Sequence, residues 1–551
     1  MEKYRGVSDA VHLYINEIQC SLVAKTGIPS DRYHFGKLTL EAFRDAPETI
    51  LQIDGVTEET ESYNSVLERT VKCANAFRNL GLHRNDVIIL MAPNHIHLSI
   101  PMYAAFYLGV SVAGIDMYLL VNELEDNFKD TEPKVVFCQN DRAEDVKKAL
   151  SALNLTCKVV TFDKGPDYEG FDDFLNKHGH GPSPQEFRAS DFDPVDTTLF
   201  LIATSGTTGL PKTAEVTHKN MMHGISYMWA NFEEFPKPTR LPIIVSPIQW
   251  FSAIFFYATT PMFRLTRLQS SLTMTQELAY DLINKYKPTF AFSSPNMWTT
   301  LFKPGHEGKC DFSCFEVIFI GGSAMHPSLF EEMKKTIPDT FILNVYGQSE
   351  LGGLGMIFDP YFPESLGRPV PYLKARLVNP ETEEEINVPN VSGELWLKGP
   401  SVFKGYRNRP DATRSTLTED GWLLTGDIMY RDDKWYFYYV DRWKLLLKYR
   451  NHQISPVEIE GVIQKHPGVF EVAVTGIPHL EHGDLPVACV VLHEGFRVDA
   501  EEIKEMVKSS LTDSKQLRGG VLFMKELPMT PSMKVDRKKL ARLVRETVNV
   551  E

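Results

Sequence analysis

Short apolar runs alternate with longer helical stretches through most of the chain. Residues 87–91, 110–115, 135–137 and 199–202 have the length and composition of buried strands, whereas residues 143–152 have the pattern of a helix. Buried strands that alternate with helical stretches are typical of parallel sheets covered by helices. The pattern therefore predicts an α/β fold of mainly parallel sheets packed with helices.

A different pattern begins near Asp427. Residues 436–440 resemble an antiparallel strand, and residues 441–444 look like a junction between two units. A chain of 551 residues also exceeds the roughly 250–300 residues at which a single core stops growing. We therefore expect a large N-terminal domain, residues 1–440, and a small α+β domain, residues 441–551.

The composition excludes several classes of protein. A hydrophobic fraction of 43% and a charged fraction of 24% are ordinary for a globular protein and exclude a disordered chain. The 58 basic and 72 acidic residues give a net charge of −14, which argues against a nucleic-acid partner. Seven cysteines are a sparse and odd number, so we expect free thiols in a reducing compartment.

Two uncharged stretches, residues 87–115 and 241–263, are long enough to cross a membrane. Proline, asparagine, glutamine or histidine interrupts both of them, so we expect buried core elements and no transmembrane segment. The N-terminus is charged and lacks the apolar region of a signal peptide, and the C-terminus lacks a peroxisomal tripeptide. We expect a cytoplasmic protein, with the peroxisome as the alternative.

A loop rich in hydroxyl groups and glycines follows the strand at residues 199–202. Residues 204–212 read Thr-Ser-Gly-Thr-Thr-Gly-Leu-Pro-Lys. Glycine amides and hydroxyl groups can surround phosphate oxygens, and a lysine adds positive charge. The lysine does not directly follow the second glycine, so the loop is not a Walker A motif. The loop predicts a phosphate site, and an ordinary surface loop is the alternative.

This loop resembles the phosphate loop of the adenylate-forming (ANL) superfamily, which includes acyl- and aryl-CoA synthetases, 4-coumarate–CoA ligases and beetle luciferases. Other segments resemble further motifs of that superfamily, in the same order: residues 346–350, 421–427, 441–444 with 448–450, 456–460 and 528–537. The segment from Leu397 to Glu460 looks closest to the luciferase and 4-coumarate ligase branch. The resemblance implies the adenylate-forming fold, with a small mobile C-terminal domain that turns about a hinge at Asp441.

The resemblance also implies a reaction in two halves. A carboxylic acid attacks the α-phosphate of ATP bound with Mg²⁺, which yields acyl-AMP and pyrophosphate, and a thiol then takes the acyl group. Coenzyme A is the expected thiol. Because the attacking and leaving groups are both anionic, the site must supply positive charge and positioning.

Residues of the nucleotide site follow from the same resemblance. Tyr346 is expected to stack on adenine, Asp427 to accept the ribose hydroxyls and Arg442 to donate to the ribose. Lys212 is expected to close the phosphate loop. Further nucleotide-binding residues implied by the resemblance are Thr204, Ser205, Gly206, Thr207, Thr208, Gly209, Gly322, Ser323 and Gly347.

Four residues are expected to serve the chemistry directly. Ser349 stands where the family has threonine and is expected to donate to the α-phosphate. Glu350 is expected to hold Mg²⁺, which prefers hard oxygen ligands. Lys534 is expected to reach from the small domain to the attacking carboxylate and the α-phosphate. Lys448 lies where the family places a residue for the second half-reaction.

The acyl pocket is expected around a further set of residues: Trp250, Ser252, Gly321, Gln348 and Leu354. Many relatives carry histidine where this chain has Trp250. Tryptophan is larger and has a single hydrogen-bond donor, so we expect it to narrow the pocket or to gate it differently. The sequence names neither the acid nor the oligomeric state.

Three glycines of the family pattern are replaced, by Thr213, Asn451 and Met533. Glycine allows positive φ or a close approach of the backbone to a ligand. Asn451 argues against the thioester step more than against adenylation. Two alternatives therefore stand beside a ligase. One is a weakened relative that binds nucleotide or acyl-adenylate as a sensor or carrier, and the other is a luciferase-type enzyme that oxidises the adenylate.

Overall fold

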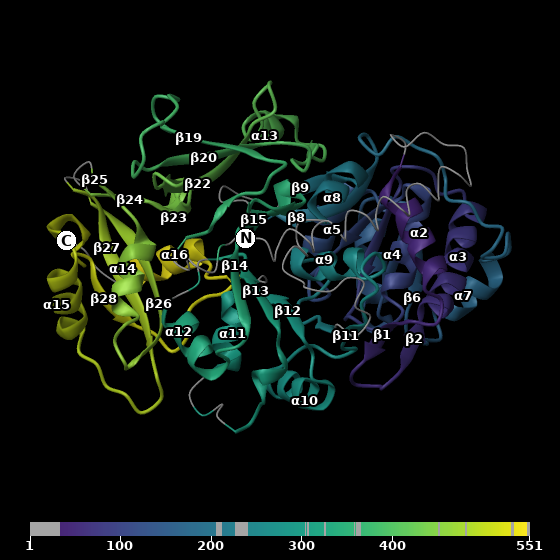
Figure 1. The fold of residues 1–551 in the computed structure, drawn as a ribbon, viewed down its shortest axis with the longest axis horizontal. Coiled ribbons are helices and arrows are strands. Elements are labelled where there is room, and N and C mark those ends of the chain that lie inside the picture. Colours follow the sequence, from purple (N-terminus) through teal and green to yellow (C-terminus); the bar gives the residue numbers. More distant parts are fainter. Residues whose placement is uncertain are drawn as a thin grey trace.

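The structure is a computed structural model that describes residues 33–547 apart from several short segments. The segments outside the described residues are 205–211, 226–240, 303–304, 306–307, 324, 326, 358, 360–364, 450–451, 480–481 and 531–533. Two large sheets with their helices occupy the right and centre of Figure 1, and a separate C-terminal sheet lies at the left. No helix of the described residues combines the length and apolar character needed to cross a membrane.

The first large sheet has eight strands and is mainly parallel. Its order is β21 (Gly405–Tyr406), β9 (Lys212–Thr217), β8 (Thr198–Thr204), β4 (Ser111–Gly114), β3 (Val87–Met91), β5 (Val135–Cys138), β6 (Lys158–Thr161) and β7 (Glu169–Gly170). Strands β3 to β8 pair in parallel, and β9 is antiparallel to both β8 and β21. The mainly parallel sheet predicted from the buried apolar runs is confirmed.

The second large sheet has seven strands, of which six run parallel. Its order is β14 (Phe341–Val345), β13 (Val317–Gly321), β12 (Phe290–Ser293), β10 (Pro242–Ile243), β11 (Arg267–Gln269), β1 (Ile50–Asp54) and β2 (Thr60–Ser62). Only β2 is antiparallel to its neighbour. Because parallel strands end at the same edge, the carboxyl ends of β12, β13 and β14 form one rim.

Helix α4 (Ser99–Leu108) is buried along its whole length. Helices α2 (Phe35–Asp45) and α3 (Tyr63–Asn79) pack on it, and its Tyr103 hydroxyl donates to the Tyr257 carbonyl of α9 (Phe251–Thr259). A helix that is apolar all round is buried on all sides. The remaining helices of this part are α5 (Val121–Thr131), α6 (Asn140–Ala152), α7 (Phe171–His178), α8 (His218–Ile225), α10 (Gln276–Tyr286), α11 (Pro295–Leu301), α12 (Pro327–Thr336) and α13 (Pro410–Arg414).

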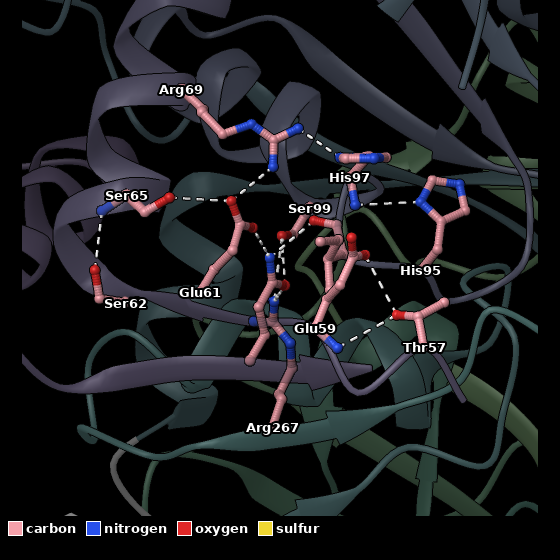
Figure 2. Close-up of polar contacts among 12 residues, drawn as sticks. Thr57, Glu59, Glu61, Ser62, Ser65, Arg69, His95, His97, Ser99 and Arg267 are labelled. Atoms are coloured by element: carbon pink, nitrogen blue, oxygen red, sulfur yellow. Dashed lines mark hydrogen bonds and ion pairs between the residues drawn. The ribbon is translucent and has the colours of Figure 1, made fainter. Parts of the chain in front are cut away.

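A buried polar network joins the second sheet to α3 and α4 (Figure 2). Arg267 on β11 is fully buried and donates to the Ser99 hydroxyl at 3.2 Å and to the Tyr103 hydroxyl at 2.7 Å. At the edge of the network, Glu61 pairs with Arg69 at 2.7 Å. Buried polar groups need hydrogen-bond partners, so this network fixes how the sheet meets the helices.

A four-stranded antiparallel sheet follows the two large ones. Its order is β19 (Lys374–Val378), β20 (Gly393–Lys398), β22 (Leu423–Arg431) and β23 (Phe437–Arg442). The antiparallel strand predicted at residues 436–440 lies within β23. Asp441 lies near the end of this strand, where it pairs with Ile428. The predicted domain boundary at Asp441 therefore falls inside a strand, and it stays a prediction.

The C-terminal unit has its own sheet and its own core. The strands are β25 (His452–Ile454), β24 (Leu447–Tyr449), β27 (Gly483–Leu492), β26 (Val469–His479) and β28 (Gly520–Phe523). Helices α14 (Pro456–Ile463) and α15 (Ala500–Ser510) pack on one face. Helix α16 (Arg537–Thr547) packs on the other face through Leu540 and Val544. Helices on both faces of a mostly antiparallel sheet agree with the α+β unit expected here.

Candidate active site

The two ends of the predicted phosphate loop lie side by side in the first sheet. Thr204 ends β8, Lys212 begins β9, and the two residues are cross-strand partners. The Thr204 hydroxyl also donates to the Lys212 carbonyl at 3.1 Å. The residues between them, among them Ser205, Gly206, Thr207, Thr208 and Gly209, lie outside the described residues.

Tyr406 joins this loop to the predicted metal ligand. It lies in β21, the neighbour of β9, and its hydroxyl donates to Oε1 of Glu350 at 2.6 Å. The Lys212 ammonium lies 5.1 Å from the centre of the same aromatic ring. Burial and the charge of Glu350 raise the pKa of Tyr406, which keeps the phenol protonated and able to donate. Sequence reasoning missed Tyr406, because only the pairing of β21 with β9 brings it to the site.

Ser349 and Glu350 share one turn of 3-10 helix, Ser349–Leu351, which follows the short strand β15 (Gly347–Gln348). Gly352 ends this turn with φ at +55°. The Glu350 carbonyl accepts a hydrogen bond from the Phe403 amide at 2.8 Å. Among the described residues, only Oε1 of the Glu350 carboxylate accepts a hydrogen bond, so Oε2 is available to a cation. A single carboxylate next to a phosphate loop fits Mg²⁺, which commonly binds few protein ligands together with substrate phosphates.

Asp427 is the centre of a buried cluster in β22. It is 2% exposed, and its Oδ1 lies 2.7 Å from Nε of Arg442, the residue opposite it in β23. Its Oδ2 accepts hydrogen bonds from the Tyr346 hydroxyl at 2.7 Å and from Nε2 of Gln348 at 2.6 Å. The Asp427 charge raises the pKa of Arg442, so this guanidinium stays positively charged. Four residues from three sequence motifs therefore meet at one carboxylate.

Gln348 and Tyr346 take part in this cluster in ways the sequence did not indicate. Besides Asp427, Gln348 donates to the Thr425 carbonyl at 2.9 Å, which holds its amide beside Asp427. Tyr346 is 8% exposed, and a Cβ atom on Gly355 would lie 3.0 Å from its ring. The acyl-pocket role of Gln348 and the adenine-stacking role of Tyr346 stay predictions.

Lys534 comes from the C-terminal unit and interacts electrostatically with the same cluster. Lys534 as a whole residue is exposed to solvent. Partial desolvation of its ammonium group nevertheless lowers the pKa of Lys534, and the positive charge of Arg442 lowers this pKa further. The charges of Asp427 and Glu350 act in the opposite direction. These three electrostatic partners all belong to the predicted site, so the charge of Lys534 is coupled to it.

An ion pair holds the start of α16, close to Lys534. Arg537 binds Glu460 of α14 through two nitrogens, at 2.9 and 3.1 Å. Oε1 of Glu460 also accepts the Val474 amide at 2.7 Å. Two parallel hydrogen bonds fix both the position and the orientation of a guanidinium. The pair thus anchors the segment that carries Lys534, and the sequence alone did not reveal it.

The expected hinge residue is tied to the first helix of the C-terminal unit. Oδ2 of Asp441 accepts the Ser455 hydroxyl at 2.7 Å and the Val457 amide at 3.3 Å, both at the start of α14. Burial raises the pKa of Asp441. Lys448 lies elsewhere, on β24, where its side chain is exposed and its ammonium lies 5.9 Å from the Trp443 ring.

The residues expected in the acyl pocket lie on several elements of the large domain. Trp250 precedes α9 and is half-buried, and the Ser252 hydroxyl donates to the Ser246 hydroxyl at 2.8 Å. Gly321 ends β13, and Gly322 after it has φ at +94°. Exposed Ser323 follows, and buried Leu354 of β16 (Gly353–Leu354) pairs with Gly347.

Only one of the three replaced glycines lies in the described part of the chain. Thr213 is 6% exposed within β9 and pairs with Ala203. It is not among the residues with positive φ, so a threonine fits this strand without backbone strain. Asn451 and Met533 lie outside the described residues.

Comparisons with known proteins agree with this arrangement. Residues 40–407 match the family model described as AMP-binding enzyme, and residues 458–534 match the AMP-binding enzyme C-terminal domain. A luciferin 4-monooxygenase of Photuris pensylvanica is 29% identical over 92% of this chain and 93% of its own length. A probable CoA ligase of Humulus lupulus is 27% identical over 93% of this chain and 91% of its own length.

A solved structure, ATP-bound MatB from Rhodopseudomonas palustris, has the same fold. Its TM-score is 0.83 at 23% sequence identity, over 94% of this chain and all of that one. The chain therefore belongs to the AMP-binding enzyme family, within the adenylate-forming superfamily, as its motifs predicted.

Proposed function

We propose that the protein uses ATP to activate a carboxylic acid as acyl-AMP, releases pyrophosphate, and transfers the acyl group to coenzyme A. One observation carries the proposal: the buried Asp427 carboxylate binds Arg442, Tyr346 and Gln348, and the charge of Lys534 from the C-terminal unit is coupled to this cluster. The family match and the relative named as a probable CoA ligase support the same reaction.

Asp427 and Arg442 would hold the ribose of ATP. An ionised carboxylate accepts two hydroxyl groups well, and Asp427 is buried and kept in place by Arg442. Its Oδ2 is occupied by Tyr346 and Gln348, so the ribose hydroxyls would share or displace those donors. The exchange replaces hydrogen bonds without leaving a buried charge unpaired.

The phosphates would lie between the phosphate loop and Glu350. Lys212 adds positive charge from β9, and Tyr406 holds both Lys212 and Glu350 through one side chain. Mg²⁺, when bound, would neutralise charge on the phosphate oxygens. Glu350 would hold it through Oε2, and Ser349 in the same turn would donate to the α-phosphate.

Lys534 would act at the reacting atoms. A carboxylate oxygen of the acid attacks the α-phosphorus, a new P–O bond forms, and the bond to pyrophosphate breaks. Negative charge gathers on the phosphate oxygens at that moment, and a positioned ammonium stabilises it. Hydrogen bonds and charges that exist before the reaction cost no rearrangement during it, which is why the Glu460–Arg537 anchor next to Lys534 matters.

The second step would transfer the acyl group. The thiol of coenzyme A loses its proton to solvent and its sulfur attacks the acyl carbonyl. A C–S bond forms, the acyl C–O bond of the mixed anhydride breaks, and AMP leaves with the bridging oxygen. A turn of the C-terminal unit about Asp441 would exchange Lys534 for the segment that carries Lys448. Because Asp441 accepts hydrogen bonds from the start of α14, this helix would move together with Asp441.

Exchange between ATP and labelled pyrophosphate tests the proposal. The assay uses Mg²⁺ and pools of short, medium and long fatty acids, cinnamates, benzoates and amino acids, with Lys534→Ala as the blank. We expect acid-dependent exchange with one pool and thioester formation when coenzyme A is added. If a folded protein that binds ATP exchanges with no pool, the ligase proposal is wrong and a nucleotide-binding sensor or carrier takes its place.

A further inference from the structure

Solvent exposure falls off sharply along α9 and β13, the two elements expected to line the acid site. Ser252 in the first turn of α9 is half-buried and Gly322 after β13 is exposed. One step deeper, residues 253–259 of α9 are all buried. Phe319, two residues before Gly321 on β13, is only 2% exposed. Along these two elements, the described residues are therefore accessible at the rim and buried directly beneath it.

Five buried aromatic rings lie on these elements and on the neighbouring strand β12. We call them the phenylalanine floor: Phe255, Phe256, Phe290, Phe292 and Phe319. Ring centres lie 5.0 Å apart for Phe256 and Phe290, 5.1 Å for Phe290 and Phe319, and 5.8 Å for Phe255 and Phe292. Phe292 and Phe319 complete the set at 5.9 Å. These pairs meet edge to face, the arrangement in which aromatic rings attract one another.

Secondary structure explains why the floor lies under the predicted acid site. Phe255 and Phe256 follow Ser252 by three and four positions on α9, so they share its face of the helix. Phe319 and Gly321 are two residues apart on β13, so they share a face of the strand. Phe292 is the register partner of Phe319 in the neighbouring strand β12. The rim residues and the floor thus belong to the same faces of the same elements.

A long substrate has no path through these rings. Protein interiors are close-packed, and a chain that extended beyond the rim would have to displace at least Phe319 and Phe256. An apolar floor without polar groups also suits a short hydrocarbon end. We propose that the acid is a short-chain aliphatic carboxylic acid, such as propionate or butyrate, and that Phe319 and Phe256 set the length limit. This inference rests on the proposed function, since it concerns the acid that is activated.

A chain-length series with the full-length protein tests the proposal. Pyrophosphate exchange is measured with acetate, propionate, butyrate, hexanoate, octanoate, laurate and cinnamate at saturating ATP and Mg²⁺. We expect kcat/KM to be highest for propionate or butyrate and at least about tenfold lower for octanoate, because a clash in a packed pocket costs at least that much.

Two variants test the residues that set the limit. Phe319→Val and Phe256→Val each remove a ring from the floor, and each should raise the octanoate-to-butyrate ratio of kcat/KM by about tenfold. Phe174→Val is the matched control, because Phe174 is equally buried but packs against Phe137 on β5. The control should leave the ratio unchanged. If one floor variant does not fold, the other variant and the wild-type series still decide.

The outcomes separate this inference from the proposed function. If the wild-type protein uses octanoate, laurate or cinnamate as well as butyrate, the short-chain inference is wrong while the ligase function stands. An unchanged ratio in both floor variants removes Phe319 and Phe256 as the limiting residues. No exchange with any acid, in a protein that binds ATP, overturns the proposed function and this inference with it.

Discussion

The Tyr406 hydroxyl donates a 2.6 Å hydrogen bond to the Glu350 carboxylate, although the two residues are 56 positions apart in the chain. The same ring lies under the Lys212 ammonium. One tyrosine thus links the end of the phosphate loop to the carboxylate that we expect to hold Mg²⁺. Hydrogen bonds to a charged group are stronger than those between neutral groups, so the link can restrict the positions of Glu350.

Removing the Tyr406 hydroxyl should weaken adenylation and its use of Mg²⁺. Loss of a hydrogen bond to a carboxylate costs about 1.5–3 kcal/mol, so Tyr406→Phe should lower the exchange rate about tenfold to a hundredfold and raise the Mg²⁺ concentration for half-maximal rate. Tyr406→Leu should do more, because it also removes the ring under Lys212. Exchange rates over a range of Mg²⁺ concentrations measure both effects.

Tyr436→Phe is the matched control for this prediction. Its hydroxyl also donates to a carboxylate, Asp359, at 2.6 Å, but neither residue is among those expected at the site. The control should keep the wild-type Mg²⁺ dependence. An unchanged Mg²⁺ dependence in Tyr406→Phe would show that Tyr406 does not position Glu350.

Lys534→Ala should separate chemistry from nucleotide binding. Loss of one preorganised donor at a developing charge typically costs about a hundredfold or more in rate, whereas ATP contacts in the large domain remain. We expect exchange to fall by that amount and the ATP dissociation constant to change only slightly. Lys538→Ala on α16, also exposed, is the control and should behave like the wild type. Equal losses of exchange rate and of affinity for ATP would show that Lys534 does not act in the chemical step.

The Glu460–Arg537 pair should support both stability and catalysis. Glu460→Gln leaves the partly buried Arg537 without its paired charge, so we expect the free energy of unfolding to fall by about 1–3 kcal/mol. We also expect slower exchange, because Arg537 anchors the start of α16 beside Lys534. Urea unfolding and exchange rates are the measurements.

Glu458→Gln provides the comparison on the same helix. Glu458 pairs with Lys515 at 2.6 Å, and its side chain is 43% exposed. Exposed ion pairs contribute about 0–1 kcal/mol, so this variant should change stability and rate little. Equal effects of the two variants would contradict a special role for Glu460.

His34 should make stability fall in acid. Its Nδ1 accepts the Lys37 amide at 3.3 Å and its Nε2 lies 2.8 Å from the Ser190 carbonyl, so the buried ring is neutral. Burial lowers the pKa of His34 to about 3, against about 6.5 in an unfolded chain. The neutral His34 ring therefore makes its full contribution to the free energy of unfolding above pH 6.5. This contribution is lost as the pH falls toward 3, and about 2 kcal/mol of it is lost at pH 5.

Thermal unfolding of the wild type and of His34→Asn at pH 7 and pH 5 measures this effect. Asparagine can still accept the Lys37 amide but does not titrate in this range. The wild type should lose more of its midpoint temperature between the two pH values than the variant does. Equal losses would mean that His34 does not contribute to the acid sensitivity.

The parallel sheets and the family could both be predicted from the amino-acid sequence. Buried strands and helices leave periodic patterns over a few residues. The order of the motifs from Thr204 to Lys534 is likewise visible in the sequence without any knowledge of the fold. The same local information was enough to nominate Asp427, Arg442 and Glu350. It could also raise a concern about Thr213, because a missing glycine is visible in a motif.

The contacts among these residues could be seen only in the folded chain. Thr213 lies in a regular strand, the Tyr406 hydroxyl donates a hydrogen bond to Glu350, and the amide of Gln348 donates one to Asp427. The folded chain also assembles the phenylalanine floor from a helix and two parallel strands. Such contacts depend on strand order and register between distant segments, and the pattern along a single segment carries no information about them.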